Sequence, residues 1–264
     1  MQPETVQTLL DLNRRFYEDF GPAFAATRRR VQDGVRRALD AIVERGEGGR
    51  WLDLGCGSGA LAVEWLRRGL PGSYLGLDFS AALLQEATAA AAASEAAASA
   101  GQLPAGRVAF AQADLGDPRW ADGLEPGFSG VMMFASLHHL PSHALRVSLL
   151  KQIHALLAPG GRLVHSEWQF QHAPKLMARV QPWQRAGLDP DALEPGDTLL
   201  DWRFALPGQA EQVGLRYVHL FSLPELEALA RDSGFRVLET YESDGHGGRL
   251  SVYQWWQKTD HRAK

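Results

Sequence analysis

The stretch LDLGCGSG at residues 52–59 decides the fold. Its first three residues are typical of a short strand, and the alternating glycines let the backbone turn sharply and approach a ligand closely. Asp78 ends the next expected strand, 23 residues after Gly55. A carboxylate near this spacing suits a ribose, because it accepts hydrogen bonds from two hydroxyl groups. The alternative role of Asp78 is to cap the helix that starts near Ser80, although Ser80 already meets that need.

Strands and helices alternate from this turn onward. This alternation predicts a parallel sheet with helices on both of its faces. The apolar run from Val131 to Ala135 is what a strand buried on both faces needs. The alanine-rich segment 87–100 is expected to be a solvated helix without a chemical role. The expected elements are strands at 51–54, 73–78, 107–111, 129–134 and 162–167 and helices at 60–68, 80–100 and 142–157.

Further segments flank this core. Residues 5–20 and 23–44 are expected as two helices, with Gly21 and Pro22 interrupting between them. Residues 172–215 hold five prolines and two tryptophans, and they predict an insertion that forms a lid over the strand tips. A helix at 224–233 and an antiparallel hairpin of strands at 235–242 and 249–257 follow. The chain 1–264 is therefore interpreted as a single domain with N-terminal helices (1–49), a core (50–171), an insertion or lid (172–221) and a last helix with a terminal hairpin (222–264).

Composition limits the class of protein. The chain has 264 residues and a net charge of −4, so its overall charge does not indicate nucleic acid or an anionic membrane as a partner. Cys56 is the sole cysteine, which excludes an intramolecular disulfide. The sequence shows neither a secretory signal nor an apolar run of the ~18 residues that a membrane span needs. We expect a soluble, cytoplasmic protein that makes no contact with a membrane.

Five motifs together resemble the class I S-adenosylmethionine-dependent methyltransferases in order and spacing. A dinucleotide-binding enzyme would more usually show G-x-G-x-x-G, whereas here Gly59 follows Gly57. The resemblance implies a doubly wound, seven-stranded, mostly parallel α/β sheet whose last hairpin is reversed. It also implies S-adenosylmethionine as cofactor, lying across the strand tips, with S-adenosylhomocysteine as product. The motifs are LDLGCGSG, GLDFS at 76–80, AQADL at 111–115, MMFASLHHLP at 132–141 and LAPGGRLV at 157–164.

The resemblance implies a role for each residue that matches a family motif. The glycine loop would face the methionine part of the cofactor, Asp78 would hold the ribose and Phe79 would pack on adenine. Asp114 matches the acid that accepts from the adenine amino group, and its alternative role is a turn or helix cap before Pro118. The sulfonium and the acceptor would meet where the fourth strand ends. The implied cofactor-binding residues are Asp53, Gly55, Cys56, Gly57, Gly59, Asp78, Phe79, Ala113, Asp114, Leu115, Phe134 and Ala135.

His138 and His139 follow the fourth strand directly. A histidine at this place is able to act as a general base or to orient the acceptor. The alternative is a packed histidine that bonds to the backbone, and we expect at least one of the pair to be structural. Without a neighbouring cysteine or carboxylate cluster, the two histidines do not predict a metal site. A base is needed only where the acceptor must lose a proton.

The flanks resemble the tRNA wobble-uridine carboxymethyl methyltransferases. The similar segments are Phe16-Tyr17 with Phe24 and Thr27-Arg28, the stretch 196–202, and GLRYVHLF at 214–221. The subgroup implies methyl esterification of a carboxymethyl group on a tRNA uridine, an acceptor that is already ionised near neutral pH. The residues implied for the acceptor are Tyr17, Arg28, Trp168, Arg216, Tyr217 and His219, and the candidates for catalysis are His138, His139, Arg28 and His219.

Each of the flanking residues has a structural alternative. Tyr217 and His219 are equally suited to pack the insertion onto the core, and Arg28 to be a solvated helix residue. The arginines at 28–30, 36 and 37 form a local basic run, although such runs on helices are usually solvated faces. Eukaryotic members of the subgroup act with a small activating protein, and nothing in this sequence decides whether such a partner is needed.

Three functional hypotheses stay open. The chain is an RNA-modifying methyltransferase, a small-molecule O-, N- or C-methyltransferase with the insertion as a lid, or a cofactor-binding protein without catalysis. A broad basic groove beside the cofactor would favour an RNA acceptor. An aromatic-lined pocket would favour a small molecule. The aromatic candidates for that pocket are Trp168, Phe170, Trp183, Trp202 and Phe204.

Overall fold

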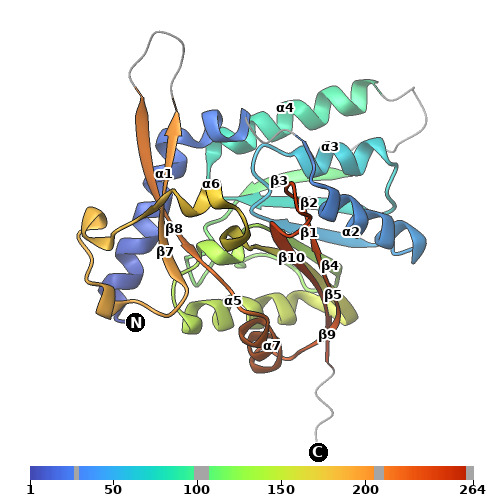
Figure 1. Cartoon of the computed structure of the whole chain (residues 1–264). Helices are drawn as coiled ribbons and strands as arrows, with labels where there is room; N and C mark the ends of the chain where they lie inside the picture. Colours follow the sequence, from blue (N-terminus) through green and yellow to red (C-terminus); the bar gives the residue numbers. More distant parts are fainter. Residues whose placement is uncertain (27–29, 98–106, 205–210, 260–264) are drawn as a thin grey trace, which may run out of the picture.

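A seven-stranded sheet forms the centre of the computed structural model, which describes residues 1–26, 30–97, 107–204 and 211–259 (Figure 1). The strand order is β3-β2-β1-β4-β5-β10-β9. The first five strands are parallel, and β10 runs antiparallel to both of its neighbours. This confirms the doubly wound sheet and its reversed last hairpin. The strands are β1 (Arg50–Leu54), β2 (Ser73–Asp78), β3 (Val108–Gln112), β4 (Phe128–Phe134), β5 (Leu157–Trp168), β9 (Phe235–Ser243) and β10 (Ser251–Lys258).

Helices cover both faces of this sheet. Successive strand residues point to opposite faces, so Leu52 of β1 enters the core beneath α5 and α7, whereas Trp51 enters the core beneath α2 and α3. Both side chains are fully buried, as a parallel sheet with two covered faces requires. The helices are α2 (Asp33–Glu44), α3 (Ala60–Arg67), α4 (Ala81–Ala97), α5 (His143–Leu156) and α7 (Leu223–Asp232).

The N-terminal helix α1 spans Pro3–Ala26 and is longer than expected. The expected break at Gly21 and Pro22 was wrong, because the helix continues through both residues. A proline in a helix removes one backbone hydrogen bond and crowds the preceding turn. Packing offsets this cost: the Phe20 ring lies 5.6 Å from that of Trp202 in the insertion. Tertiary contact therefore overrides the local signal.

The insertion builds a second, three-stranded antiparallel sheet of order β6-β7-β8 (Figure 1). The prolines described between its elements lie outside the strands, so they do not interrupt pairing. A small apolar cluster that includes Trp168, Leu200 and Val218 joins this sheet to the end of β5. The short helix η1 (Leu137–His139) lies outside the insertion, directly after β4. The elements from the end of β5 through the insertion are η2 (Phe170–His172), α6 (Pro174–Met177), β6 (Val180–Gln181), η3 (Trp183–Ala186), η4 (Pro190–Ala192), β7 (Asp197–Phe204) and β8 (Gln212–His219).

Within the described ranges, the longest helices are too short or too polar to cross a membrane.

The carboxyl ends of β1, β2 and β4 lie at the edge of the large sheet that faces α1 and the insertion sheet. In doubly wound sheets, ligands bind at these ends, where the strand order reverses.

Candidate active site

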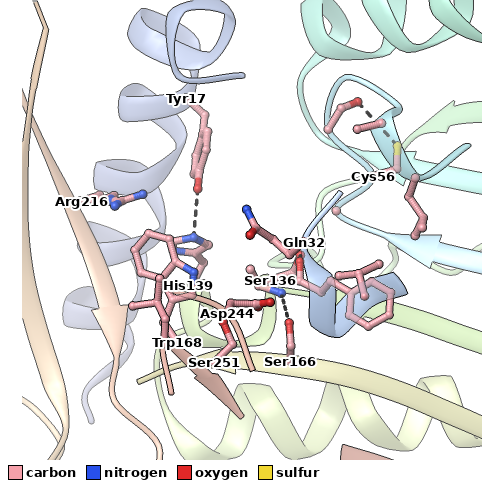
Figure 2. Close-up of a pocket in the computed structure, with 18 of the residues that line it drawn as sticks. Tyr17, Gln32, Cys56, Ser136, His139, Ser166, Trp168, Arg216, Asp244 and Ser251 are labelled. Carbon is pink, nitrogen blue, oxygen red and sulfur yellow. Dashed lines mark hydrogen bonds between the residues drawn. The ribbon is translucent and has the colours of Figure 1, made fainter. Parts of the chain in front are cut away.

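A cavity of about 1220 Å³ opens where the strand order reverses between β1 and β4. Its wall is built from the turns after β1, β2 and β4, one side of α1, the start of the insertion and the β9–β10 turn (Figure 2). Single-ligand pockets are typically roughly 300–1,000 Å³. The cavity therefore has room for two molecules side by side.

The glycine turn shapes one end of the cavity. Gly55 and Gly57 have φ angles of +76° and +55°, which L side chains rarely adopt. A Cβ at Gly55 would lie 2.3 Å from the Ser136 Oγ, whereas Gly57 borders open space in the cavity wall. Gly59 stands outside this wall. A Cβ there would lie 2.8 Å from that of Ala87, so this glycine allows α3 to pack on α4.

Asp78 lies at the tip of β2 with its carboxylate in the cavity wall. Its Oδ2 accepts from the Gly57 N–H at 2.9 Å, and its Oδ1 accepts from the Ser80 N–H at 2.9 Å. Burial raises the pKa of Asp78, although these backbone donors oppose the shift. Each oxygen keeps a second lone pair. The carboxylate is thus able to hold the turn and to accept from a pair of ligand hydroxyls.

Asp53 and Cys56 lie at the base of the glycine turn, and both side chains are buried. Burial raises the pKa of Asp53 to about 7, and the Tyr74 hydroxyl, which donates to this carboxylate, opposes the shift. Burial also raises the pKa of the Cys56 thiol well above its usual value. The thiol therefore stays protonated and does not act as a nucleophile.

Asp114 lies on the side of the cavity that α1 covers. Its Oδ1 accepts from the Gly116 N–H at 2.9 Å, which is the turn role considered from the sequence. Its Oδ2 pairs with Arg14 at 2.7 Å. Phe79, Ala113 and Leu115 line the same wall. Their predicted contact with the cofactor stays a prediction. The contact with Arg14 was not expected from the sequence.

The chain reverses sharply where β4 ends. Phe134 and Ala135 both line the cavity, between its two ends. Ala135 has a φ angle of +54°, an unfavourable value for a residue with a side chain. Its N–H donates to the Ser166 carbonyl at 2.9 Å, which holds the turn in place. This turn carries the chain into η1 and brings His139 to the cavity.

Tyr17, His139 and Arg216 meet at the other end of the cavity (Figure 2). The Nδ1 of His139 lies 3.1 Å from the Tyr217 carbonyl, which only accepts, so Nδ1 carries the hydrogen. The Nε2 of the neutral ring therefore accepts from the Tyr17 hydroxyl at 2.9 Å. Tyr17 comes from α1, His139 from η1 and Arg216 from β8.

Arg216 is buried in an aromatic frame. Its side chain is 2% exposed, and its guanidinium carbon lies 4.6 Å from the Trp168 ring centre and 5.5 Å from that of Phe16. Burial lowers the pKa of Arg216, and a hydrogen bond with Tyr17 opposes this shift. Arginine stays charged even so. The end of the cavity that Tyr17, His139 and Arg216 line thus presents a desolvated cation.

The other candidate residues within the described ranges do not line the cavity. Arg28 lies outside the described residues. His138 is fully buried behind the wall, where Glu167 Oε2 lies 2.9 Å from its Nδ1 and 3.1 Å from its backbone nitrogen. Burial raises the pKa of Glu167 well above its usual value. His138 thus holds η1 against β5 and does not face the cavity.

Tyr217 and His219 belong to a buried network that joins the insertion to α5 and α7. His219 lies between two carboxylates, 2.7 Å from Asp197 and 2.8 Å from Glu225. Burial alone would lower the pKa of His219, but these two partners raise it. Arg146 lies 3.1 Å from Glu225, and the Tyr217 hydroxyl donates to Asp197 at 2.8 Å.

Three members of this region have potential metal-ligand atoms within 4.8 Å of one another, namely Glu194, Asp197 and His219. The Nη2 of Arg146 lies 3.1 Å from Glu194 and 3.9 Å from Asp197. A guanidinium therefore already supplies the positive charge that these carboxylates need. The contacts indicate a structural clamp.

Comparison with known proteins agrees with this geometry. Residues 24–240 match the family model of a methyltransferase domain. The chain belongs to the class I S-adenosylmethionine-dependent methyltransferases. A protein of Encephalitozoon cuniculi, named as a methyltransferase without a stated acceptor, is 28% identical over 225 residues, which cover 85% of this chain and 87% of the relative.

Solved structures share the methyltransferase fold. An S-adenosylmethionine-dependent methyltransferase from Clostridium acetobutylicum superposes with a TM-score of 0.65 at 13% identity, covering 94% of this chain and 99% of that one. The amino pentose methyltransferase CalS10 of Micromonospora echinaspora, solved with S-adenosylmethionine bound, gives 0.57 at 22% identity, with 90% and 96% covered.

S-adenosylmethionine is the methyl donor of this methyltransferase, and the residues present fit it. The open space beside Gly57 and the two accepting oxygens of Asp78 suit the cofactor's methionine and ribose parts. Sequence reasoning missed Asn13 and Arg14, which line the cavity from α1 together with Tyr17. The sequence held one signal for Asn13: it precedes the candidate Tyr17 by four residues, so the two side chains share a helix face.

Proposed function

We propose that this methyltransferase converts a carboxylate into its methyl ester. The observation that carries the proposal is the buried guanidinium of Arg216, which lines the acceptor end of the cavity between aromatic rings. A planar guanidinium binds a carboxylate through two parallel hydrogen bonds. Desolvation strengthens that attraction.

The reaction asks for positioning more than for proton transfer. When bound, S-adenosylmethionine would supply an electrophilic methyl group: the carboxylate oxygen would bond to the methyl carbon as the carbon–sulfur bond breaks, with neutral S-adenosylhomocysteine as the leaving group. The carboxylate is already ionised near neutral pH, so no base is required. His139 fits this scheme because its Nε2 already accepts from Tyr17. In this scheme Tyr17 and His139 orient the acceptor, and Arg216 binds both carboxylate oxygens, each of which keeps a second lone pair for attack.

The carboxymethyl group of a tRNA wobble uridine is the acceptor that we favour. Tyr17 and Arg216 lie in the two flanking segments that resemble the wobble-uridine enzymes, and both line this end of the cavity. Among the described lining residues, every exposed titratable side chain is basic, whereas the lining acids are buried or, for Asp114, paired with Arg14. The basic side chains are Arg30, His172, Lys175, His246 and Arg249.

A small-molecule acceptor is the second candidate. The observation that favours it is the cover that α1 and the insertion place over the cavity. The similar CalS10 acts on an amino pentose. Of the five aromatic residues expected to line a lid, Trp168 does so, while Trp202 stacks on Phe204 and packs against α1. Fewer of the expected aromatic side chains line the cavity than we expect for a small-molecule site.

Transfer of labelled methyl from S-adenosylmethionine tests the proposal. The acceptors are tRNA carrying 5-carboxymethyluridine, unmodified tRNA and a panel of small carboxylic acids and phenols. We expect label in the modified tRNA and none in the unmodified tRNA. Label in a small carboxylic acid would keep the chemistry and favour the second candidate, whereas label confined to phenols would refute a carboxylate acceptor.

Arg216→Lys tests the residue that carries the proposal. Lysine keeps the charge but loses the planar pair of donors, so we expect the acceptor KM to rise by roughly tenfold or more, about 1.4 kcal/mol, with cofactor affinity unchanged. Arg203→Lys is the matched control, because Arg203 lies in the same small sheet, is 42% exposed and pairs with Asp201. Equal acceptor KM values in the two variants would contradict the role of Arg216.

A further inference from the structure

Asn13 of α1 makes contact with two other segments at the acceptor end. It is 7% exposed and lines the cavity. Its Nδ2 donates to the His139 carbonyl and to the Tyr217 carbonyl, each at 3.1 Å, and its Oδ1 accepts from the Tyr217 N–H at 2.8 Å. The amide thus binds both backbone groups of Tyr217, as a paired strand would.

The place of Tyr217 explains why an amide is needed there. β8 is an edge strand of the three-stranded sheet, so part of its backbone has no neighbouring strand. Buried backbone groups need partners. Asn13 supplies a donor and an acceptor to the same residue, and its second N–H reaches the His139 carbonyl. A carboxylate of the same shape has no donor, and an alanine has neither group.

These bonds fix the positions of the three acceptor-end side chains. Adjacent strand residues point to opposite faces, so holding the Tyr217 backbone sets the direction of Arg216. The same amide holds η1 at His139, and Tyr17 follows Asn13 by one turn of α1. One side chain therefore connects the three segments on which these residues lie.

We propose that Asn13 is the positioning residue that assembles the acceptor site, which makes α1 part of the active site. The inference rests on the proposed carboxylate methylation. Asn13 itself transfers no proton and holds no charge. Its loss changes where Arg216 and His139 point, and it leaves the glycine turn and Asp78 at the cofactor end untouched.

Asn13→Asp tests this role, with Gln254→Glu as the matched control. Gln254 is also a buried amide with a donor and an acceptor contact, but it lies in β10 outside the cavity wall. We expect Asn13→Asp to raise the acceptor KM about tenfold while the cofactor Kd stays within about twofold. Gln254→Glu is expected to lower the melting temperature and to leave the acceptor KM unchanged.

A pH profile separates positioning from general damage. The introduced carboxyl at position 13 faces two carbonyls, so burial favours its protonated form, which donates one hydrogen bond. We expect the KM defect of Asn13→Asp to shrink between about pH 8 and about pH 5.5, and Asn13→Gln, which keeps both groups, to recover part of the affinity. A KM defect that is independent of pH would contradict the proposal, as would equal defects in the control.

The ring nitrogens of His139 give a readout that needs no acceptor. In the wild type, ¹⁵N chemical shifts should report hydrogen on Nδ1 and an accepting Nε2. We expect this tautomer preference to weaken in Asn13→Asp at about pH 8, where the introduced carboxylate has no donor, and to persist in Gln254→Glu. Unchanged His139 signals in Asn13→Asp would refute the positioning role. Failure of the wild type to methylate any carboxylate would refute the proposed function and leave this result standing.

Discussion

Two aspartates at the cofactor end show how environment decides the chemistry of identical side chains. Asp78 accepts backbone hydrogen bonds from Gly57 and Ser80, which oppose the effect of burial on its pKa. Asp53 has the Tyr74 hydroxyl as a partner, and burial raises its pKa to about 7. Asp53 is therefore the residue whose charge changes near neutral pH.

The pKa of Asp53 predicts that cofactor affinity depends on pH. S-adenosylmethionine is cationic at its sulfonium and amino groups, so it favours the ionised carboxylate and binding releases a proton. Affinity should then rise as pH increases toward about 7 and level off above it. Titration calorimetry from about pH 5.5 to about pH 8 measures this. Asp53→Asn should flatten the profile, and an equally steep profile in that variant would contradict the assignment.

At the scale of residues, more of the residues predicted for the cofactor than of those predicted for the acceptor line the cavity. The glycines and Asp78 lie next to one another along the chain or at a fixed strand spacing, so their pattern is local. Asn13 is 126 residues from His139 and 204 from Tyr217, and no local pattern signals such contacts. The pairing of Arg14 with Asp114 escaped prediction for the same reason.

At the scale of elements, the insertion is fastened to the core by a buried charged network. β7 supplies Asp197, β8 supplies His219 and α7 supplies Glu225, with Arg146 of α5 beside them. The sequence singled out His219 as a candidate for catalysis or for packing. The structure places its ring in this clamp, away from the cavity wall.

The raised pKa of His219 predicts a pH-dependent contribution to stability. The protonated ring is favoured in the folded state, so this contribution is complete below the unfolded value of about 6.5 and is lost as pH rises through the folded pKa. His219→Gln should cost roughly 1–3 kcal/mol at about pH 6 and less at about pH 9, measured by urea unfolding. His143→Gln, at a half-exposed pair with Asp232, is the control. A loss of unfolding free energy that grows with pH in His219→Gln would contradict a stabilising, protonated His219 in this network.

The sequence predicted the ends of helices and strands well where residues next to those ends determine them. Most strands and helices of the core lie close to their expected ranges, because alternating apolar segments and glycine turns mark their ends. The exception is β5, which begins at Leu157 where 162 was expected, because Leu157 pairs with Phe128 of β4. The expected break in α1 at Pro22 was wrong, since packing on the insertion carries the helix through. The strands β7 and β8 were missed, because proline-rich connections around them suggested irregular structure.

At the scale of the whole molecule, charge is distributed unevenly. The chain has a net charge of −4, yet the exposed titratable residues that the structure shows on the cavity wall are basic. Arg30 and Arg249 pair with Asp33 and Glu242. Exposed pairs of this kind contribute little and are readily exchanged for another anion. If the proposed function holds, this basic cavity mouth on an acidic protein should favour anionic acceptors.

This distribution predicts salt-dependent binding of RNA. The double variant Lys175→Glu, Arg249→Glu should weaken binding of a tRNA anticodon stem-loop and reduce the slope of log Kd against log salt by about one to two. The control Arg119→Glu, Arg236→Glu makes the same change in net charge at exposed residues outside the cavity wall. Fluorescence anisotropy over a salt series measures both. Equal loss in the two double variants would show that overall charge alone governs binding.

The stability of the transferred methyl group in alkali distinguishes a carboxylate acceptor from every other acceptor considered. A methyl ester releases its methyl as methanol in mild alkali, whereas methyl groups on nitrogen, carbon or a phenolic oxygen stay attached. Labelled product from the wild-type enzyme should therefore be treated with alkali and the volatile label counted. We expect the label to become volatile and Arg216→Lys to form much less of it. Label that survives alkali would contradict a carboxylate acceptor.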